Sequence, residues 1–464
     1  MRTHAIVLAG GGGSRFGADV PKQFLRLAGE PILLRTLRTI AVAGVDQIVV
    51  VVHPEWLGEA EALVRRARLE QRARVVAGGE TRNQSTRAGL AELVAAADDD
   101  IVLVHDAVRP LLPPEVVART IEPIAAGAAD ATDTVIPSAD TLVVVDGERV
   151  VEIPERSRFR RGQTPQAFRL GVLRAAYDAA TAAGQLDATD DLTLVLRHLP
   201  GARVVAVAGD EFNLKITTQL DFVLADRMIQ MRTLALEPAA PEAAGRALAG
   251  ERMLVVGGTH GIGQAIAAGA ESAGARVEVD GRSRGLDVRD YGLLDRRVEE
   301  AAGRLGGLDH VVVTAGVLRI GSLAGCTPAE IAEVVDVNLT GSLNVAHAVH
   351  RHLRRGGGSL TLFASSSFTR GRSGYVAYSA SKAAVVNLAQ GLADEWYDEG
   401  IRVNAVSPER TDTEMRRRAF PDEATDELLA ADAVAAATLR LIESDLTGQV
   451  LDVRRHESRR ADVP

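Results

Sequence analysis

A short apolar strand that runs directly into a glycine-rich turn occurs twice in this 464-residue chain, first at residues 5–13 and again at residues 253–263. A strand, a glycine turn and a helix together form the phosphate-binding opening of nucleotide-binding α/β domains, because bare backbone N–H groups can approach an anion closely. Each domain of this kind needs one such opening. The chain is therefore expected to contain two α/β domains, which also suits its length.

Apolar runs of strand length alternate with longer Ala-, Leu- and Arg-rich stretches in both halves, which predicts wound, mainly parallel sheets. The expected strands are residues 5–8, 48–52, 101–104, 204–207, 253–256, 277–279, 310–313, 359–363, 403–406 and 450–453, and the clearest helices are 31–43, 84–97 and one beginning at Gln264. An aperiodic Ala/Pro/Glu-rich segment follows Glu237. We predict a first domain over 1–232, a linker over 233–250 and a second domain over 251–464.

The composition excludes several classes of protein. Hydrophobic residues make up 46% and charged residues 25% of the chain, as in globular proteins. The net charge of −9 predicts no general surface for nucleic acid, so phosphate must be bound by locally placed cations. Cys326 is the only cysteine, which excludes an internal disulfide framework and fits a reducing compartment. Without a signal peptide or an 18-residue apolar run, the protein is expected to be cytoplasmic and without a membrane partner.

The first glycine turn is built for a triphosphate. It contains Ala9, Gly10, Gly11 and Gly13, and its anion-binding residues continue with Arg15 and the triplet Pro21-Lys22-Gln23. Arg15 can hold phosphate bidentately, whereas Lys22 supplies a compact point charge. Glycines alone would also fit a flexible loop, but the accompanying cations favour phosphate binding.

This segment resembles the signature of the family that contains 2-C-methyl-D-erythritol 4-phosphate and D-ribitol 5-phosphate cytidylyltransferases. Further matches extend over roughly residues 3–230, and they imply a nucleotidyltransferase Rossmann-like α/β fold. The resemblance implies that Ser85 contacts the cytidine nucleotide, that Asp106 helps to hold Mg²⁺ and substrate, and that Arg156 reaches across a dimer to the polyol phosphate. The remaining matched substrate residues are Gly79, Arg82, Arg109, Thr141 and Thr189, with Lys215 as another phosphate cation.

The chemistry of such a site needs no protein nucleophile. A phosphomonoester oxygen attacks the α-phosphorus of CTP in line, and pyrophosphate leaves. The protein positions the reactants and offsets the growing charge with Arg15, Lys22, Lys215 and Mg²⁺. The alternative interpretation of Asp106 is a structural or capping carboxylate without a catalytic role, since aspartate is common in turns.

The second half carries the residues of a proton-transfer site. Tyr378 and Lys382 are four residues apart and therefore share one helix face, while Ser365 and Asn338 precede them in the chain. A neighbouring ammonium favours the phenolate and is expected to lower a tyrosine pKa that is about 10 when unperturbed. Tyr378 would then donate a proton near neutral pH. The alternative is an ordinary amphipathic helix pair.

This constellation resembles the short-chain dehydrogenase/reductase family over roughly residues 250–455, which implies an NAD(P)-binding Rossmann fold. By that resemblance Tyr378 is the general acid, Lys382 tunes it and binds the nicotinamide ribose, Ser365 holds the substrate carbonyl and Asn338 anchors a relay water. The serine assignment leaves Ser366 and Ser367 open. Tyr375 is a rival tyrosine, but it has no lysine four residues later.

The charge near the second expected strand favours NADPH. Gly281 stands where relatives that use NAD carry an acid, Arg282 follows it, and His260 lies in the glycine turn. Asp280, one residue earlier, leaves NADH open. The full set of expected cofactor-binding residues is Gly257, Thr259, His260, Gly261, Ile262, Gly263, Arg282, Asp287, Val288, Ala315, Gly316 and Pro408.

Three positions depart from the family pattern. Val256 replaces a threonine before the first glycine, residues 313–314 read Val-Thr instead of Asn-Asn, and Glu409 replaces a glycine beside the nicotinamide and substrate. Glu409 and Arg410 are therefore candidates for substrate recognition. Arg410, Arg370 and Arg372 could bind a substrate phosphate, or each could be merely solvated.

The fusion itself resembles the bacterial bifunctional ribulose 5-phosphate reductase/CDP-ribitol pyrophosphorylases. It implies reduction of D-ribulose 5-phosphate by NADPH, followed by coupling of D-ribitol 5-phosphate to CTP, with both families usually forming dimers or larger assemblies. The alternatives are a methylerythritol phosphate cytidylyltransferase fused to an unrelated reductase, a synthase for another alditol such as arabinitol, and a binding or scaffold protein with decayed sites. The sugar rests on analogy, because fold does not fix substrate.

Overall fold

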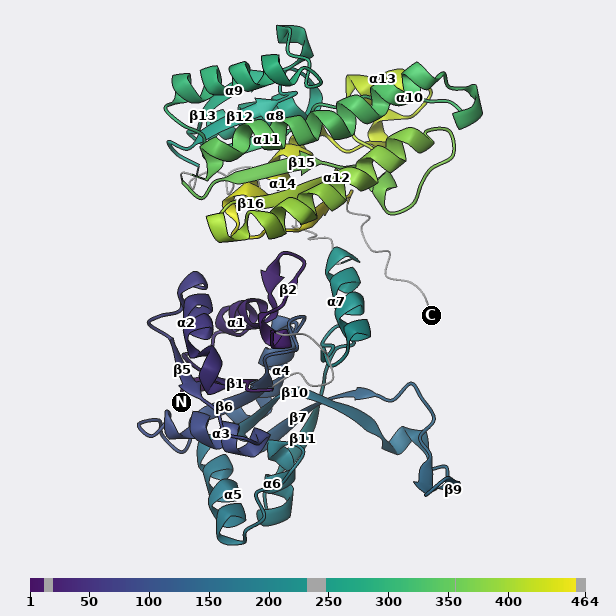
Figure 1. Ribbon diagram of the computed structural model, residues 1–464. Helices are drawn as coiled ribbons and strands as arrows, with labels where there is room; N and C mark the ends of the chain where they lie inside the picture. The colour runs from purple at the N-terminus through teal and green to yellow at the C-terminus, as the bar shows by residue number, and fades with distance from the viewer. Residues whose placement is uncertain (12–19, 232–247, 355, 456–464) are drawn as a thin grey trace. The chain divides into compact units, whose positions relative to one another are not determined.

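The structure is a computed structural model that describes residues 1–11, 20–231, 248–354 and 356–455. The chain divides into two compact units, Met1–Met228 and Ile229–Pro464 (Figure 1). In the described ranges, every helix is too short or too polar to cross a lipid bilayer.

The first unit is built on a seven-stranded sheet with the strand order β11-β7-β10-β6-β1-β4-β5. Its strands are β1 (Thr3–Ala9), β4 (Gln47–Val52), β5 (Ala73–Ala77), β6 (Ile101–Asp106), β7 (Ala131–Pro137), β10 (Arg160–Arg169) and β11 (Val204–Ala208). The sheet is mixed, because β10 is antiparallel to both β6 and β7. The chain returns from β7 to β10 without a crossover helix, and a parallel return would need one.

Helices cover both faces of this sheet. They are α1 (Ile32–Val42), α2 (Leu57–Arg66) and α4 (Pro114–Ala125) on one face, with α3 (Arg82–Ala91), α5 (Leu170–Ala182) and α6 (Asp191–His198) on the other. A further helix, α7 (Gln219–Met231), follows β11. Two apolar cores, built mainly from Val, Leu, Ile and Ala, therefore sandwich the sheet.

A two-stranded hairpin projects away from this sheet between β7 and β10 (Figure 1). It consists of β8 (Val144–Asp146) and β9 (Arg149–Glu152), whose residues are all exposed. Val145 keeps 56% and Val151 keeps 53% of its surface exposed. This hairpin, called the arm below, therefore exposes apolar side chains that no core of its own buries.

The second unit has a six-stranded sheet in the order β13-β12-β14-β15-β16-β17, and all its pairs are parallel. Its strands are β12 (Arg252–Val256), β13 (Arg276–Asp280), β14 (His310–Val313), β15 (Ser359–Phe363), β16 (Arg402–Pro408) and β17 (Val450–Val453). The helices α9 (Tyr291–Leu305), α11 (Gly341–Leu353) and α12 (Val376–Glu395) pack on one face, and α8 (Gly261–Ser272) and α14 (Ala431–Glu443) pack on the other. Shorter helices are α10 (Pro328–Val335) and α13 (Glu414–Ala419).

All the expected strands are confirmed, and two of the expected helices, 31–43 and 84–97, correspond to α1 and α3. The third begins at Gly261 instead of Gln264. Leu248, placed at the end of the expected linker, is buried in the core of the second unit. Residues 232–247, which hold most of that linker, lie outside the described residues.

In both units the strand order reverses beside the strand that enters the glycine turn. The chain leaves β1 toward β4 and β5 and later crosses to β6 on the other side, and it leaves β12 toward β13 before crossing to β14. Ligands in open α/β sheets bind at such a reversal, beyond the carboxyl ends of the strands. The fold therefore directs attention to the ends of β1 and β6 and of β12 and β14.

Candidate active sites

The first glycine turn is fastened by a glutamine. Gln23 is 1% exposed, and its Nε2 donates to the carbonyl oxygens of Ala9 at 2.6 Å and Gly11 at 3.4 Å. Lys22 precedes it at the start of a short 3₁₀ helix and stays partly exposed. The predicted residues Gly13 and Arg15 lie outside the described residues. Sequence reasoning included Gln23 in the motif but gave it no role, which the contacts now supply.

Ser85 lies where two glycine segments meet. It is in the first turn of α3, whose start is fixed by a reciprocal capping box between Thr81 and Gln84. Its Oγ accepts from the Gly79 N–H at 3.2 Å. A Cβ on Gly10 would lie 3.4 Å from the same oxygen. Gly10, Gly79 and Ser85 are thus brought together beside the N–H groups that begin α3, an arrangement that suits an anion.

Asp106 ends β6 beneath three cations. Lys215 Nζ is 2.9 Å and Arg109 Nε 3.6 Å from its Oδ2, and Arg82 Nε is 3.9 Å from its Oδ1. Burial alone would raise the pKa of this carboxyl, but Lys215, Arg82 and Arg109 outweigh it and hold the pKa far below its usual range. With the buried Asp191 that also pairs with Arg82, the group carries two negative and three positive charges, and its excess positive charge suits a polyphosphate.

A buried polar network holds these cations in place. Arg82 forms an ion pair with Asp191, which is fully buried and also accepts from the Tyr177 hydroxyl at 2.6 Å. On the other side, Arg109 donates to the Asn213 carbonyl at 2.7 Å. Sequence reasoning missed Asp191 and Tyr177. Their signal was slight: Asp191 lies two residues after the expected Thr189, and Tyr177 lies within a helix.

Among the residues that the structure describes, three expected substrate residues make no polar contact with the cluster around Asp106. Thr141 and Thr189 are exposed. Arg156 donates to the Ala139 carbonyl at 3.1 Å and lines an open depression of about 490 Å³ at the base of the hairpin, together with Ser138 and Arg160. Within the described ranges, no hydrogen bond or ion pair joins Arg156, Thr141 or Thr189 to Asp106.

The described residues contain no group of three or more His, Cys, Asp or Glu side chains that would hold a metal ion by themselves. Asp106 is a single carboxylate among cations, which disfavours a bare divalent ion. Mg²⁺ is commonly bound by one or two carboxylates plus substrate phosphates. The site therefore fits Mg²⁺ that is shared with a triphosphate.

The second glycine turn approaches the end of β14 very closely. Gly257 has φ +90°, and a Cβ there would lie 2.4 Å from the Ala315 nitrogen. A Cβ on Gly263 would lie 2.4 Å from Thr314 Oγ1, which also contacts the Val256 carbonyl at 3.4 Å. Thr314, one of the departures from the family pattern, thus places a hydroxyl against the turn that Val256 leaves without one. Only glycine fits these two positions.

At the end of β13, an acidic side chain that already has protein partners is followed by an exposed basic one. Asp280 accepts from the Gly281 N–H at 2.7 Å and lies 3.7 Å from Arg297 Nε. Arg282 is exposed at the start of the following turn. Because Asp280 already has protein partners, the group that faces solvent beside Gly281 is a cation.

The other expected cofactor residues lie at the ends of strands in the second unit or in the segments that follow them. Asp287 is paired with Arg289 at 2.6 Å, and the Val288 carbonyl accepts from Asn344 at 2.9 Å. The remaining members are Thr259, whose hydroxyl is 3.0 Å from His260 Nδ1, together with Gly261 and Ile262 at the start of α8, Gly316 after β14, and Pro408 at the end of β16.

Tyr378 and Lys382 share one face of α12, as predicted. Lys382 Nζ donates to the Phe363 carbonyl at 2.8 Å and lies 5.8 Å from the centre of the Tyr378 ring. Burial lowers the pKa of Lys382 to about 8. Burial also raises the pKa of Tyr378, against the opposing effects of the Ser365 hydroxyl and the Arg416 charge. The expected lowering of the tyrosine pKa is therefore wrong here, because desolvation of the phenol exceeds these two effects.

Of the three candidate serines, Ser365 is the one whose hydroxyl lies close enough to Tyr378 to lower its pKa. Its Oγ also contacts Ser367 Oγ at 3.3 Å. Asn338 is fully buried in a single π-helical turn, Asp336–Thr340, between α10 and α11. Its amide donates to the Val317 carbonyl and to Ser381 Oγ, both at 3.0 Å. Each of the four predicted residues of this site therefore has a polar contact with another part of the second unit. Single π-helical turns such as the one that holds Asn338 are often found at functional positions.

The segment after β16 carries a second set of charges. The Glu409 carboxylate accepts from the Arg455 N–H at 3.2 Å, and Arg410 NH1 is 3.1 Å from Glu423. Arg370 and Arg372 are exposed, and their guanidinium groups make no hydrogen bond or ion pair in the part of the chain that the structure describes. Of these cations, only Arg410 is held in place by a partner.

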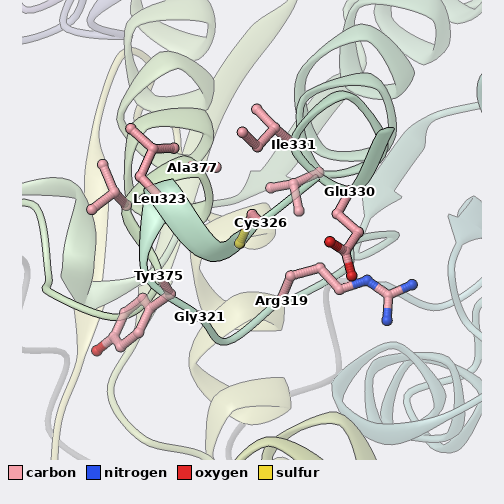
Figure 2. A pocket seen from close by; sticks show the side chains of 10 residues that line it. Arg319, Gly321, Leu323, Cys326, Glu330, Ile331, Tyr375 and Ala377 are labelled. Atoms are coloured by element: carbon pink, nitrogen blue, oxygen red, sulfur yellow. The ribbon is translucent and has the colours of Figure 1, made fainter. Parts of the chain in front are cut away.

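A small cavity lies between α10 and the start of α12 (Figure 2). Its volume is about 10 Å³, enough for roughly one water molecule and far too small for a sugar phosphate. Cys326 faces it, whereas the Tyr375 ring is turned away from Cys326. The cavity is therefore distinct from the site around Tyr378.

Comparison with known proteins defines the class of each unit. The family model described as 2-C-methyl-D-erythritol 4-phosphate cytidylyltransferase matches residues 3–231, and the model described as short chain dehydrogenase matches residues 282–424. The chain thus carries a nucleotidyltransferase domain followed by a short-chain dehydrogenase domain, as predicted. A domain of the second class implies use of a nicotinamide cofactor.

Both classes occur together in a full-length relative. The bifunctional ribulose 5-phosphate reductase/CDP-ribitol pyrophosphorylase of Haemophilus influenzae is 37% identical over 452 residues, which cover 97% of this chain and 95% of that protein. This chain belongs to the family of bifunctional ribulose 5-phosphate reductase/CDP-ribitol pyrophosphorylases.

Two relatives match the first unit alone. A 2-C-methyl-D-erythritol 4-phosphate cytidylyltransferase of Thermobifida fusca is 40% identical over 235 residues, 49% of this chain and 94% of that protein. A ribitol-5-phosphate cytidylyltransferase of Lactiplantibacillus plantarum is 34% identical over 235 residues, 50% of this chain and 99% of that protein.

Proposed function

We propose that this enzyme reduces D-ribulose 5-phosphate to D-ribitol 5-phosphate with NADPH and then couples the product to CTP, giving CDP-ribitol and pyrophosphate. The observation that carries this proposal is the similarity along 97% of the chain to a protein whose name states both activities. The geometry supports it, because each unit assembles its own set of polar residues at the reversal of its sheet.

In the first unit, the backbone of Ala9, Gly10 and Gly11, with Gly79 and Ser85, would hold the cytidine nucleotide. Lys22 and Lys215, together with Arg15, would offset the charge that builds up as the phosphomonoester oxygen attacks the α-phosphorus and pyrophosphate leaves. Mg²⁺, when bound with the triphosphate beside Asp106, supplies further positive charge. The ion pairs from Lys215, Arg82 and Arg109 hold the pKa of Asp106 below its usual range, so its carboxylate is ionised at neutral pH.

In the second unit, the Ser365 hydroxyl would donate a hydrogen bond to the substrate carbonyl beside Tyr378, and Tyr378 would deliver the proton to the carbonyl oxygen. NADPH, when bound along Gly257 to Gly263, supplies the hydride. Lys382 would hold the nicotinamide ribose while its charge favours the proton transfer, and Asn338 would anchor the water that returns a proton.

The finer choice of cofactor rests on charge. Arg282 is exposed beside Gly281, whereas Asp280 is engaged by the Gly281 N–H and by Arg297. A 2′-phosphate would meet a cation there, whereas a ribose 2′-hydroxyl would meet no free acid. This arrangement supports NADPH over NADH.

We also infer a homodimer or larger assembly. The exposed valines of the hairpin need a surface to cover them, and Arg156 lies in an open depression with no protein anion paired to it in the described ranges. Sedimentation of the full chain measures the assembly. A Val151→Asp change on the arm should weaken it, whereas Val94→Asp, at an even more exposed valine in the turn after α3, should not.

The direct test is to incubate the full chain with ribulose 5-phosphate, NADPH, CTP and Mg²⁺ and to identify the product by mass spectrometry. The proposal predicts a CDP-pentitol whose formation stops when NADPH is omitted and resumes when ribitol 5-phosphate is added. Chromatography against ribitol and arabinitol standards settles the stereochemistry. Absence of any CDP-alditol would overturn the proposal.

A second candidate is a methylerythritol phosphate cytidylyltransferase fused to a reductase of another substrate. It is favoured by one observation, the 40% identity of the first unit to such an enzyme, against 34% to a ribitol-5-phosphate cytidylyltransferase. It predicts turnover of methylerythritol phosphate with CTP and no use of ribitol 5-phosphate. Measuring kcat/KM for both alditol phosphates in one assay separates the two candidates.

A further inference from the structure

We propose that Arg416, fixed by Glu423, binds the phosphate of the phosphorylated ketose that the second unit reduces. Sequence reasoning offered Arg410, Arg370 and Arg372 for this role and did not consider Arg416. The inference rests on the proposed function, because it assumes a phosphorylated carbonyl substrate. It adds the residue that distinguishes such a substrate from its unphosphorylated counterpart.

A row of aromatic rings connects Arg416 to the reacting tyrosine. The Arg416 guanidinium lies 3.8 Å from the centre of the Phe420 ring. Phe420 packs edge-on against Tyr375, and Tyr375 packs edge-on against Tyr378, each with ring centres 6.2 Å apart. The Arg416 charge is close enough to Tyr378 to lower its pKa, against the larger effect of burial. The cation is therefore near enough to the phenol to act on it electrostatically.

Glu423 fixes the orientation of Arg416. Its two carboxylate oxygens accept from Arg416 Nε at 2.6 Å and NH2 at 2.8 Å, a bidentate pair, and Arg410 NH1 is 3.1 Å away. The hydrogen bonds from Arg416 are the main cause of the lowered pKa of Glu423, which is therefore ionised. Two guanidinium groups share the Glu423 carboxylate, and the second acid of the cluster, the exposed Glu427, faces Arg410 and not Arg416. A preorganised guanidinium loses little entropy when it accepts an anion.

The other cations are less suited to this role. Arg416 keeps 20% of its side chain exposed, against 45% for Arg410, which also faces the exposed Glu427 at 3.7 Å. Arg370 and Arg372 are exposed and make no side-chain hydrogen bond in the described ranges. A phosphate bound by a partly buried guanidinium is less screened by solvent than one bound at the surface. Arg416 is thus the cation best able to hold a dianion in a fixed place.

The test compares phosphorylated and unphosphorylated ketoses in the full chain. Arg416→Gln should lower kcat/KM for ribulose 5-phosphate by about 100-fold, mainly through KM, because a charged hydrogen-bonded pair is lost. Reduction of unphosphorylated ribulose, measured at high concentration, should change by less than about 3-fold on the same scale. Arg418→Gln is the matched control, since Arg418 lies on the same helix, is 76% exposed and pairs with Glu414.

Two further readouts separate phosphate binding from a structural role. Binding of NADPH by the same variant reports whether the second unit is folded and should be unchanged. Added guanidinium ion should restore part of the ribulose 5-phosphate activity of Arg416→Ala. Equal losses with both ketoses, or no loss with either, would overturn the inference.

The outcome for the wild-type enzyme is read separately. If it ignores ribulose 5-phosphate, the proposed function fails. A panel of other carbonyl compounds, each with and without phosphate, then tests Arg416 alone: a preference for the phosphorylated member that disappears in Arg416→Gln supports the inference, and no preference refutes it.

Discussion

The two units have similar α/β folds, but the charges around their candidate active sites differ. Around Asp106, three cations converge on one buried carboxylate, and the site carries excess positive charge before any ligand arrives. Around Tyr378, the buried lysine and phenol have neutral partners, the Phe363 carbonyl and the Ser365 hydroxyl. The first arrangement suits a reaction in which negative charge grows on phosphate, and the second suits delivery of one proton.

The largest expected effect, which tests whether the two units carry separate activities, is at Tyr378. Tyr378→Phe should lower ketose reduction by about 10³-fold, because it removes the proton donor while keeping the ring. Cytidylyl transfer from supplied ribitol 5-phosphate should be unaffected. The rate of NADPH oxidation measures the loss, and Tyr375→Phe is the control at the rival tyrosine. Comparable losses in both variants would contradict the assignment.

The reciprocal change is Asp106→Asn in the first unit. It removes the carboxylate beneath three cations, and cytidylyl transfer should fall by about 10²-fold while ketose reduction continues. Pyrophosphate release measures the first activity. Because the cations lose their partner, the first unit should also melt at a lower temperature. Asp98→Asn, an exposed ion-paired carboxylate in the same unit, should change neither activity nor melting. Full activity of Asp106→Asn would refute a role for this carboxylate.

A smaller effect sharpens the cofactor choice. Arg282→Gln should raise KM for NADPH about 10-fold, equivalent to about 1.4 kcal/mol, and leave KM for NADH nearly unchanged. Arg284→Gln is the matched control, since Arg284 lies in the same turn but donates to the Val279 carbonyl. If KM for both cofactors rises equally, Arg282 does not read the 2′-phosphate.

The smallest effect concerns pH and the buried lysine. The pKa of Lys382 is lowered to about 8 in the folded state from 10.5, so between these values the unfolded chain binds more protons. Stability of the second unit should therefore rise with pH, by about 1 kcal/mol between pH 8 and pH 9. Denaturant unfolding followed by Trp396 fluorescence in a Trp56→Phe background measures it. Lys382→Met should lose the slope, and a slope that persists would assign it elsewhere.

Sequence predicted best what is local in the chain. The second strand-turn-helix opening and the Tyr378–Lys382 pair depend on residues within a single turn or helix, and the structure confirms both. The antiparallel β10 was not foreseen, since periodicity does not reveal strand direction. Asp191 beneath Arg82 and the pairing of Arg416 with Glu423 depend on packing between elements. The direction of the Tyr378 pKa depends on burial, which spacing alone does not give.

The single π-helical turn at Asp336–Thr340 makes the position of Asn338 sensitive to the deletion of a single residue. Successive residues of a helix are rotated by about 100°, so removal of one residue from this turn would restore regular α-helical hydrogen bonding and swing Asn338 away from Val317 and Ser381. The local helix would become more regular while the site lost its anchor. Point changes around this turn can thus persist in descendants, whereas one-residue deletions there should be eliminated by selection.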